Sequence, residues 1–509
     1  MPTRTALVFP PLAALSLTAA LAGGDIEVIF TEVPGHATAV VPGAVDLDGK
    51  RIVTEFKAME LFSLAPDGSA WIVKGRNTAG SDLETMLLIG SGTEGVMLAQ
   101  EGQPVHDGVA GEVYEFFGSG PPRFNRLGQY VFTARARGGD STRKHKGIMY
   151  DGAAFHMMRQ ESDPALGLLD LPPNPSGDEL FGNSFGSMHL LDDGTIGYQD
   201  STIKNIHSSR RPAIFYNDTA FLQSGVSGVE EGEWDSFDAN RFLTTPDGEV
   251  WMAQGDDAGP TANDDVLVVS GQVVLREGSV IPGTAVIVDA ISQIHLAVNG
   301  DWYARGDDPV DDDWAVVNGA LVAGTGTPVV AGSGEQWGNR IVSFSGNATG
   351  DWVIAGGTDD KDVNANDVVV LNGKTILARE GDPVDLDGNG RFDDDAFIGR
   401  GDPTATAFLG NDIAIGDDGS VYVIAALRNA AGEDLGADGL AGDAFLRIRA
   451  SGVPCPQDLD GSGDVGFVDL LRVLAAWGPC PGCPEDFDRS GDVGFTDLLA
   501  TLAAWGPCR

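Results

Sequence analysis

Short runs of alternating apolar and polar residues, each preceded by a glycine turn, recur along most of the chain. LAPDGSAWIVKG, TTPDGEVWMAQG, AVNGDWYARG and NATGDWVIAG each place a turn directly before an aromatic or β-branched run. A second phrase follows each one, as in DDVLVVSGQVVLREG and NDVVVLNGKTILAREG, where a tight turn joins two apolar runs. Both patterns are typical of β-hairpins. The body of the chain is therefore predicted to consist of four-stranded units.

Seven such units are marked by the turn glycines Gly68, Gly128, Gly194, Gly248, Gly300, Gly350 and Gly419. A four-stranded unit cannot bury both of its faces alone, whereas units stacked around an axis can. We therefore expect an all-β body folded as a seven-bladed β-propeller. A pair of β-sandwiches is the alternative, because the unit lengths are uneven. The phrases resemble the repeats of bacterial β-propeller families, including Asp-box and regulator-type repeats, and this resemblance implies an architecture without an activity.

The last unit lacks its closing strand. It ends in GDAFLRIRASG, without the LREG-like run of the other units, and the segment that starts at Asp25, DIEVIFTEVPGHATAVVPGAV, resembles the missing part. We therefore expect the N-terminal strand to complete the last blade and close the ring.

The first 22 residues show the three parts of a secretory signal peptide. One arginine, Arg4, precedes an apolar run that ends in Ala20-Leu21-Ala22, the pattern of a cleavage site. The run is short for a membrane helix, and no later stretch is apolar enough to span a bilayer. The sequence therefore predicts an exported protein, extracellular or attached to the cell surface, with a propeller body at 23–452 and a small module at 453–509.

The module at 453–509 contains one acidic phrase twice, as DLDGSGDVGFVDLL and DFDRSGDVGFTDLL. A twelve-residue Ca²⁺ loop carries oxygen ligands at positions 1, 3, 5, 7 and 12 and a glycine at position 6. Both copies match, and apolar residues at helical spacing follow each loop. The predicted Ca²⁺ ligands are Asp458, Asp460, Ser462, the carbonyl of Asp464 and Asp469 in the first loop, and Asp486, Asp488, Ser490, the carbonyl of Asp492 and Asp497 in the second.

With these motifs the tail resembles a type I dockerin, a small α-helical module built from duplicated EF-hand-like loops. The resemblance implies two bound Ca²⁺ ions and docking onto a cohesin-like partner. In the family, contact residues lie late in the loop and along the helix, where this chain has Phe467-Val468 and Phe495-Thr496. The alternative is that Phe467 and Phe495 form the core of the module, which their helical phase favours. Serine at loop position 5 departs from the aspartate or asparagine that is more common in the family.

All four cysteines, Cys455, Cys480, Cys483 and Cys508, lie in the tail. An exported protein meets oxidising conditions, so an even set of cysteines indicates disulfides. We expect Cys455 to pair with Cys480 and Cys483 with Cys508, because each bond then ties one loop to the end of its own helix. Four cysteines still allow three pairings, and cysteines at these positions are not a general dockerin feature.

A further acidic loop, DLDGNGRFDDD, starts at Asp385. Asp385, Asp387 and Asn389 match positions 1, 3 and 5 of a Ca²⁺ loop, but position 12 is an alanine. The closing ligand must therefore come from Asp394 or Asp395. A weaker third Ca²⁺ site is predicted here, with a solvated acidic loop as the alternative.

The formal net charge of −43, from 32 Lys and Arg against 75 Asp and Glu, opposes binding to nucleic acids. We expect the propeller to be a binding or scaffolding domain, with polysaccharide as a candidate ligand. The alternative is a carbohydrate-active enzyme, a glycoside hydrolase or polysaccharide lyase, displayed through the tail. Such an enzyme needs two carboxylates held at a defined separation, and the sequence does not identify such a pair, so no catalytic residue is predicted.

Overall fold

The computed structural model describes residues 25–170, 177–206, 212–217, 219–230, 232–389, 391–437, 441–449, 457, 459, 464–480, 483–487 and 490–507. The predicted signal peptide at residues 1–22 lies outside these residues, so export stays a prediction. No helix of the described part is long and apolar enough to cross a membrane.

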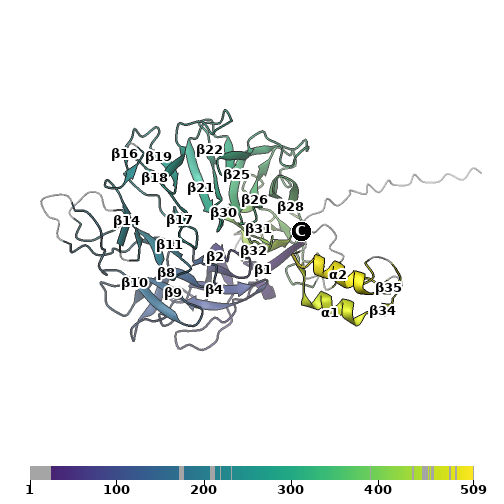
Figure 1. Cartoon of the computed structure of the whole chain (residues 1–509). Helices are drawn as coiled ribbons and strands as arrows, with labels where there is room; N and C mark the ends of the chain where they lie inside the picture. The colour runs from purple at the N-terminus through teal and green to yellow at the C-terminus, as the bar shows by residue number, and fades with distance from the viewer. Residues whose placement is uncertain are drawn as a thin grey trace, which may run out of the picture.

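Seven antiparallel sheets of four or five strands stand around a common axis in the described part of the chain (Figure 1). This arrangement confirms the seven-bladed propeller and excludes the pair of sandwiches. Blades 1 to 4 comprise β2 (Phe56–Leu64), β3 (Trp71–Asn77), β4 (Thr85–Ser91) and β5 (Glu94–Gln100); β6 (Val113–Phe117), β7 (Arg123–Phe124), β8 (Tyr130–Arg137), β9 (His145–Tyr150) and β10 (Phe155–Gln160); β11 (Phe185–Leu190), β12 (Ile196–Asp200), β13 (Ala213–Tyr216) and β14 (Thr219–Gln223); and β17 (Phe242–Thr244), β18 (Trp251–Asp256), β19 (Asp265–Val269) and β20 (Gln272–Arg276).

Blades 5 to 7 complete the ring. They comprise β21 (Ala290–Leu296), β22 (Trp302–Asp307), β23 (Asp313–Val317) and β24 (Ala320–Gly324); β25 (Trp337–Gly346), β26 (Trp352–Thr358), β27 (Asp367–Leu371) and β28 (Thr375–Arg379); and β29 (Phe397–Ile398), β30 (Phe408–Ile415), β31 (Val421–Arg428), β32 (Gly442–Arg449) and β1 (Asp25–Thr31). Outside the blades, the body has the short hairpin β15 (Gly228–Val229) and β16 (Gly232–Glu233) and the single 3₁₀ turn η1 (Ala37–Ala39) among its described residues.

The N-terminal strand β1 closes the ring, as the sequence predicts. It pairs antiparallel with β32, so that Asp25 lies opposite Arg449 and Thr31 lies opposite Ala444. The resulting sheet runs β1-β32-β31-β29, with β30 also paired to β31. Blade 7 therefore contains both the first described strand and the last strand of the body.

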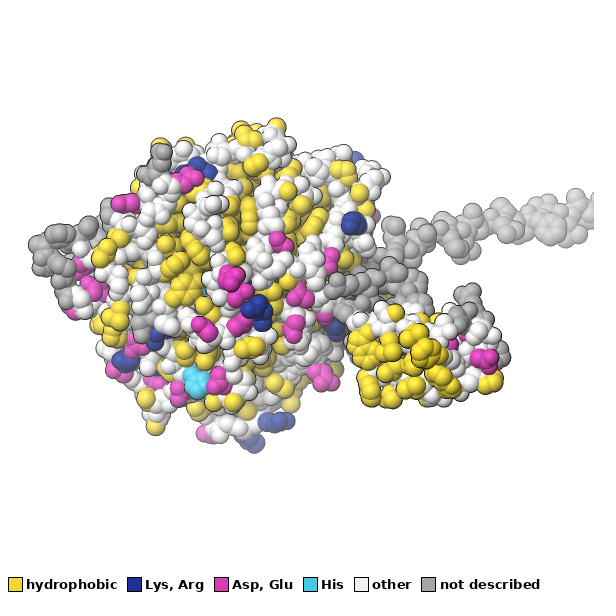
Figure 2. Space-filling view, viewed as in Figure 1, with side chains coloured by type: hydrophobic (Ala, Val, Ile, Leu, Met, Phe, Trp, Pro, Cys, Tyr) yellow, Lys and Arg dark blue, Asp and Glu magenta, His cyan; other side chains and the backbone are white. Residues whose placement is uncertain are grey.

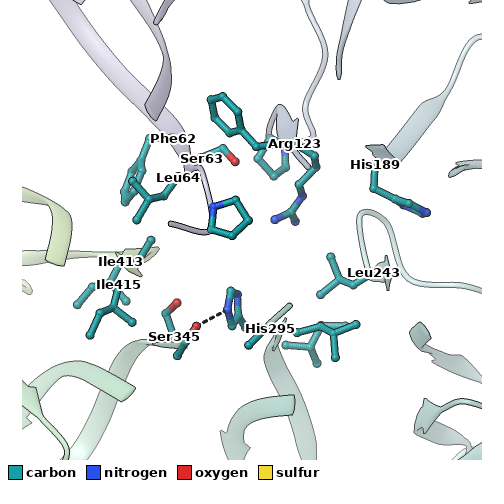
Figure 3. A pocket seen from close by; sticks show the side chains of 18 of the residues that line it. Phe62, Ser63, Leu64, Arg123, His189, Leu243, His295, Ser345, Ile413 and Ile415 are labelled. Carbon is teal, nitrogen blue, oxygen red and sulfur yellow. Dashed lines mark hydrogen bonds between the residues drawn. The ribbon is translucent and has the colours of Figure 1, made fainter. Parts of the chain in front are cut away.

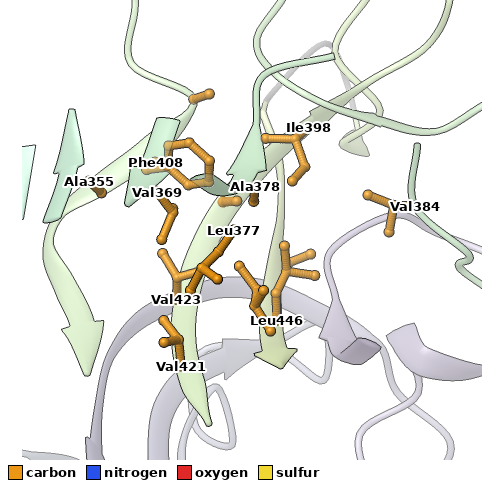
Figure 4. Close-up of a cluster of buried hydrophobic side chains, with 14 of the residues drawn as sticks. Ala355, Val369, Leu377, Ala378, Val384, Ile398, Phe408, Val421, Val423 and Leu446 are labelled. Atoms are coloured by element: carbon orange, nitrogen blue, oxygen red, sulfur yellow. The ribbon is translucent and has the colours of Figure 1, made fainter. Parts of the chain in front are cut away.

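The hydrophobic core consists of clusters between neighbouring blades. Side chains of a strand point alternately to its two faces, so Trp71 and Val73 pack toward blade 7 while Ile72 packs toward blade 2. Figure 4 shows the cluster between blades 6 and 7, where Leu377 lies close to Val423. Each of the seven interfaces between blades, including the one between blades 7 and 1, has such a cluster.

The tail contains two helices, α1 (Phe467–Ala475) and α2 (Phe495–Ala503), which Figure 1 shows outside the ring of blades. Four two-residue strands cross-connect the two halves: β33 (Asp464–Val465) pairs with β36 (Gly506–Pro507), and β34 (Gly478–Pro479) pairs with β35 (Asp492–Val493). Each loop therefore pairs with the segment that follows the other helix. This reciprocal pairing explains why the phrase occurs twice, because each half completes the other.

The core of the tail differs from the one that the helical phase favours. Phe467 and Phe495 are 65% and 66% exposed, whereas Val473 and Thr501, each 0% exposed, are buried. The interpretation of the two phenylalanines as core is therefore wrong. Helical spacing defines an apolar stripe, but it does not say whether that stripe faces the partner helix or the solvent.

Candidate functional site

The two closing acids of the predicted Ca²⁺ loops occupy equivalent and buried positions. The side chain of Asp469 accepts the backbone N–H of Leu459 at 2.7 Å and that of Gly466 at 2.7 Å. The side chain of Asp497 likewise accepts the backbone N–H groups of Phe487 and Gly494, both at 2.8 Å. Both acids are 1% exposed and are the third residue of their helix, where a carboxylate also caps the free N–H groups of the first turn. Each acid thus ties the start of its loop to the start of its helix.

The second loop also brings its other described ligands together. Asp486, 8% exposed, accepts the backbone N–H of Ser490 at 3.0 Å and that of Gly491 at 2.8 Å. Gly491 has a φ of +88°, the left-handed conformation that position 6 requires. The Ser490 hydroxyl donates to the carbonyl of Asp492 at 3.0 Å, and ligand oxygens of one Ca²⁺ ion lie about 3 Å apart.

The remaining predicted ligands are seen in part. In the first loop, the structure places the backbone of Asp464 in β33 and the side chain of Asp469 next to Leu459. The predicted ligands outside the described residues are Asp458, Asp460, Ser462 and Asp488.

The disulfide expectation for the tail is wrong in its pairing. Cys480 is bonded to Cys483, with Cα atoms 5.6 Å apart. The backbone N–H of Cys483 donates to the carbonyl of Cys480 at 3.2 Å, so a tight turn between the two halves brings the sulfurs together. Cys455 and Cys508, the partners expected within each repeat, lie outside the described residues.

The loop that starts at Asp385 gathers three carboxylates. Oxygens of Asp385, Asp387 and Asp394 lie within 4.8 Å of one another. Asn389 lies beside them, and its side-chain amide donates to Asp387 at 3.0 Å. Asp394 rather than Asp395 takes the closing position, since Asp395 instead accepts the N–H of residue 430 at 2.9 Å.

This body loop shares one contact with the two tail loops. In each of the three, the residue after the first aspartate donates its backbone N–H to the closing acid, and Leu386 does so to Asp394 at 2.7 Å. Leu386 and Val384, both 1% exposed, anchor the loop in the hydrophobic cluster between blades 6 and 7. Asp394 therefore closes a shorter loop in the way that Asp469 and Asp497 close the tail loops.

The tail helices present an apolar face to solvent. Figure 2 shows hydrophobic side chains gathered over both helices on one side of the module. Its members are all about half exposed or more: Phe467, Val468, Leu471, Leu474, Trp477, Phe495, Leu499, Leu502 and Trp505. We call this set the tail apolar face. Monomeric proteins rarely expose so many contiguous apolar side chains unless the surface binds a partner.

The propeller encloses an axial cavity of about 490 Å³, lined by one inner strand of each blade, namely β2, β7, β11, β17, β21, β25 and β30. Figure 3 shows the guanidinium of Arg123 pointing into it, with His295 on the opposite side. Sequence analysis missed both residues, although each stands five positions before the turn glycine of its blade, Gly128 and Gly300. This shared position relative to the turn glycine is the sequence signal that could have identified both residues.

Three carboxylates also line this cavity, those of Glu60, Asp412 and Asp417. Glu60 is paired with Lys74 at 3.0 Å and with Arg76 at 2.9 Å. Asp417 accepts the N–H of residue 348 at 2.8 Å. Burial, and secondarily the charge of Asp443, raises the pKa of Asp412 to about 7. The cavity thus contains acids that are engaged or partly protonated at neutral pH.

Comparison with known proteins gives distant structural likenesses only. No family model matches the chain, and no curated protein does. A chain of the mitotic checkpoint complex matches with a TM-score of 0.35 and 10% identity, covering 88% of this chain and 100% of that one. The WD40 β-propeller domain of Doa1 matches with a TM-score of 0.35 and 9% identity, covering 83% of this chain and 96% of that one. Hydrazine synthase of Kuenenia stuttgartiensis matches with a TM-score of 0.37 and 10% identity, covering 76% of this chain and 100% of that one. At these TM-scores the likenesses carry no argument about fold, ligand or activity, and the propeller rests on the sheet topology above.

Proposed function

We propose that this chain is an exported protein that displays a β-propeller binding domain through a Ca²⁺-dependent docking module at its C-terminus. In this proposal the two tail loops hold one Ca²⁺ ion each, and the tail apolar face docks onto a cohesin-like partner protein. The observation that carries the proposal is the matched pair of buried closing acids, Asp469 and Asp497, beneath a solvent-exposed apolar face.

The donor set of the second loop fits Ca²⁺. Its described groups are all oxygens, namely two buried carboxylates, a hydroxyl and a carbonyl, from Asp486, Asp497, Ser490 and Asp492, and a hard cation prefers oxygen ligands. Buried carboxylates are costly unless an opposite charge compensates them. A bound ion supplies that charge and links each loop to its helix, which matters for a module too small to fold on a hydrophobic core alone.

The shape of the tail supports a protein partner. Five residues of the tail apolar face come from the first repeat and four from the second, and each repeat presents an exposed phenylalanine at the first position of its helix. The reciprocal pairing of β33 with β36 and of β34 with β35 relates the two halves. A partner with one apolar patch can therefore dock in two orientations, as the dockerin resemblance implies.

The body loop is included in the proposal as a weaker Ca²⁺ site. Asp385, Asp387 and Asp394 supply carboxylates and Asn389 an amide oxygen, with the same closing contact as in the tail. The ion would fasten the connection from β28 of blade 6 to β29 of blade 7, the blade that closes the ring. The propeller itself is proposed as the domain that binds or scaffolds, with polysaccharide as a candidate ligand.

Surface plasmon resonance on immobilised type I cohesin domains tests this function. The full-length mature chain should bind at least one cohesin of the panel in 2 mM Ca²⁺ and dissociate when EDTA is added. Asp486→Ala combined with Asp497→Ala should abolish binding, whereas Asp359→Ala combined with Asp362→Ala, in a body loop, should leave it unchanged. Binding that persists in EDTA, or none to any cohesin in Ca²⁺, would overturn the proposed docking.

A further inference from the structure

The inner strands of the seven blades present equivalent positions to the axial cavity. Counting back five residues from each turn glycine gives Ser63, Arg123, His189, Leu243, His295, Ser345 and Ala414, and all seven line the cavity. Two of these side chains pack against the next blade: His189 against Phe242 with ring centroids 5.1 Å apart, and Leu243 within the cluster between blades 4 and 5. Arg123 differs, because its guanidinium points into the cavity (Figure 3).

Arg123 lacks the hydrogen-bond partners that other half-buried arginines of this body have. Arg305 donates to Gln293 at 2.9 Å and to the carbonyl of Ile341 at 2.8 Å, and Arg241 donates to the carbonyl of Ser292. Within the described residues, the guanidinium of Arg123 has no hydrogen-bond or ion-pair partner, and burial alone lowers its pKa to about 10. An arginine stays charged, and a buried charge without a partner is costly. The guanidinium of Arg123 is therefore placed to bind an anion in the cavity.

His295 lies on the opposite side of the cavity from Arg123 (Figure 3). Its Nε2 lies 2.7 Å from the carbonyl of Gly346, so the neutral ring donates from Nε2 and presents Nδ1 as an acceptor. Burial, and secondarily the positive charge of Arg123, lowers the pKa of His295 to about 4. His295 is therefore neutral at pH 7, and it adds a hydrogen-bonding group without adding a charge.

The rest of the cavity limits the size and charge of the ligand. About 490 Å³ suits a small molecule. Leu64, Leu243 and Ile413 provide apolar wall, and Ser63 provides a hydroxyl (Figure 3). The carboxylates that line the cavity repel a multiply charged anion, whereas a single carboxylate matches the two-pronged geometry of one guanidinium.

We infer that the axial cavity binds a small monocarboxylate, with its carboxylate held by the guanidinium of Arg123 and its body against the inner strands. This inference rests on the binding role proposed for the propeller and is independent of docking by the tail. It names the ligand class that the body recognises.

Calorimetric titration of the full-length mature chain in Ca²⁺ tests the inference. The probes are benzoate and glucuronate, each with a neutral counterpart, benzamide and glucose. We expect at least one carboxylate to bind with one site per chain, and its counterpart to bind at least tenfold more weakly, because a hydrogen bond to a charged group is lost. Arg123→Gln should weaken binding at least tenfold. Arg126→Gln is the matched control, since Arg126 lies on the outer turn paired with Asp192, and it should leave binding unchanged.

The melting temperature of Arg123→Gln separates a ligand site from a structural role. Removal of an uncompensated charge should leave the melting temperature unchanged or raise it. A carboxylate that binds Arg123→Gln as well as the wild-type chain, no binding of either carboxylate to the wild type, or a marked loss of stability in Arg123→Gln would each overturn the inference. Cohesin binding measured on the same samples reports separately on the proposed docking.

Discussion

The backbone N–H of Glu32 donates a hydrogen bond of 2.8 Å to the carbonyl of Asp443 and so joins the two ends of the body. Glu32 directly follows β1, and Asp443 lies in β32. The carboxylate of Glu32 also accepts the N–H of Met59, in blade 1, at 2.5 Å. Glu32 therefore contacts both blade 7 and blade 1, at the interface where β1 closes the ring.

Phe30→Ala should weaken the whole propeller. Phe30 of β1 is 6% exposed and packs against Trp71, with ring centroids 5.6 Å apart, in the cluster between blades 7 and 1. Truncation of a buried phenylalanine costs about 3–5 kcal/mol, so the urea midpoint should fall in one cooperative transition followed by tryptophan fluorescence. Val53→Ala, at a residue 86% exposed, is the control. Equal midpoints for the two variants would mean that β1 is not part of the cooperative unit.

The stability of the body should fall as the pH rises from 5 to 8. Burial, and secondarily the charge of Asp443, raises the pKa of Glu32 to about 8, and burial raises the pKa of Asp443 to about 6. In this range the folded state keeps protons that the unfolded state has released, so unfolding becomes easier as the pH increases. Urea midpoints at fixed Ca²⁺ concentration measure this effect.

Glu32→Gln should flatten that pH dependence. The variant carries no charge at position 32, so at pH 8 its midpoint should exceed that of the wild-type chain, while at pH 5 the two should agree. Glu94→Gln, at an exposed glutamate, should follow the wild type. A wild-type urea midpoint that increases between pH 5 and 8 would contradict the raised pKa values of Glu32 and Asp443.

The duplicated tail should tolerate the loss of either docking phenylalanine but not of both. Phe467→Asp and Phe495→Asp each remove one of two equivalent orientations, so each alone should weaken cohesin binding by only about twofold. The double variant should weaken it by about 30-fold or more, a loss of about 2 kcal/mol. Val310→Asp, at an exposed residue of the body, is the control. Binding by the double variant at wild-type strength would show that the tail apolar face is not the docking surface.

Asp394→Asn should remove the Ca²⁺ effect on the body. A ligand at 100 times its dissociation constant stabilises the folded state by about 2.7 kcal/mol, so Ca²⁺ should raise the urea midpoint of the wild-type propeller. That increase should disappear in Asp394→Asn and persist in Asp393→Asn, its neighbour outside the three-carboxylate group. If both variants keep the increase, the loop at Asp385 is a solvated acidic loop.

The blades, their number and the closing strand are predictable because they depend on local patterns. Turn glycines such as Gly68, with a φ of +78°, mark each hairpin in the sequence. The segment that starts at Asp25 resembles the strand that the last unit lacks. The axial site is not predictable in the same way. Arg123 and His295 are 172 residues apart, and only closure of the ring brings them to one cavity.

In the tail too, local residue spacing is predictive, whereas the packing of separate elements is not. Ligand spacing identifies Asp469 and Asp497, since the loop pattern is local. The direction of the Phe467 stripe depends on how two helices pack, and the pairing of Cys480 with Cys483 depends on the turn between the halves. Neither is encoded in residue spacing alone. The shorter closing distance from Asp385 to Asp394 likewise lies outside the twelve-residue rule.

Ca²⁺ titration of the full-length mature chain, read by native mass spectrometry, tests the central claim most directly. The account predicts two ions in the tail, both lost in Asp469→Asn combined with Asp497→Asn. Asp464→Asn combined with Asp492→Asn should keep both ions, because these residues contribute backbone carbonyls. A wild-type chain that binds no Ca²⁺, or the same ion count in all three proteins, would contradict the account.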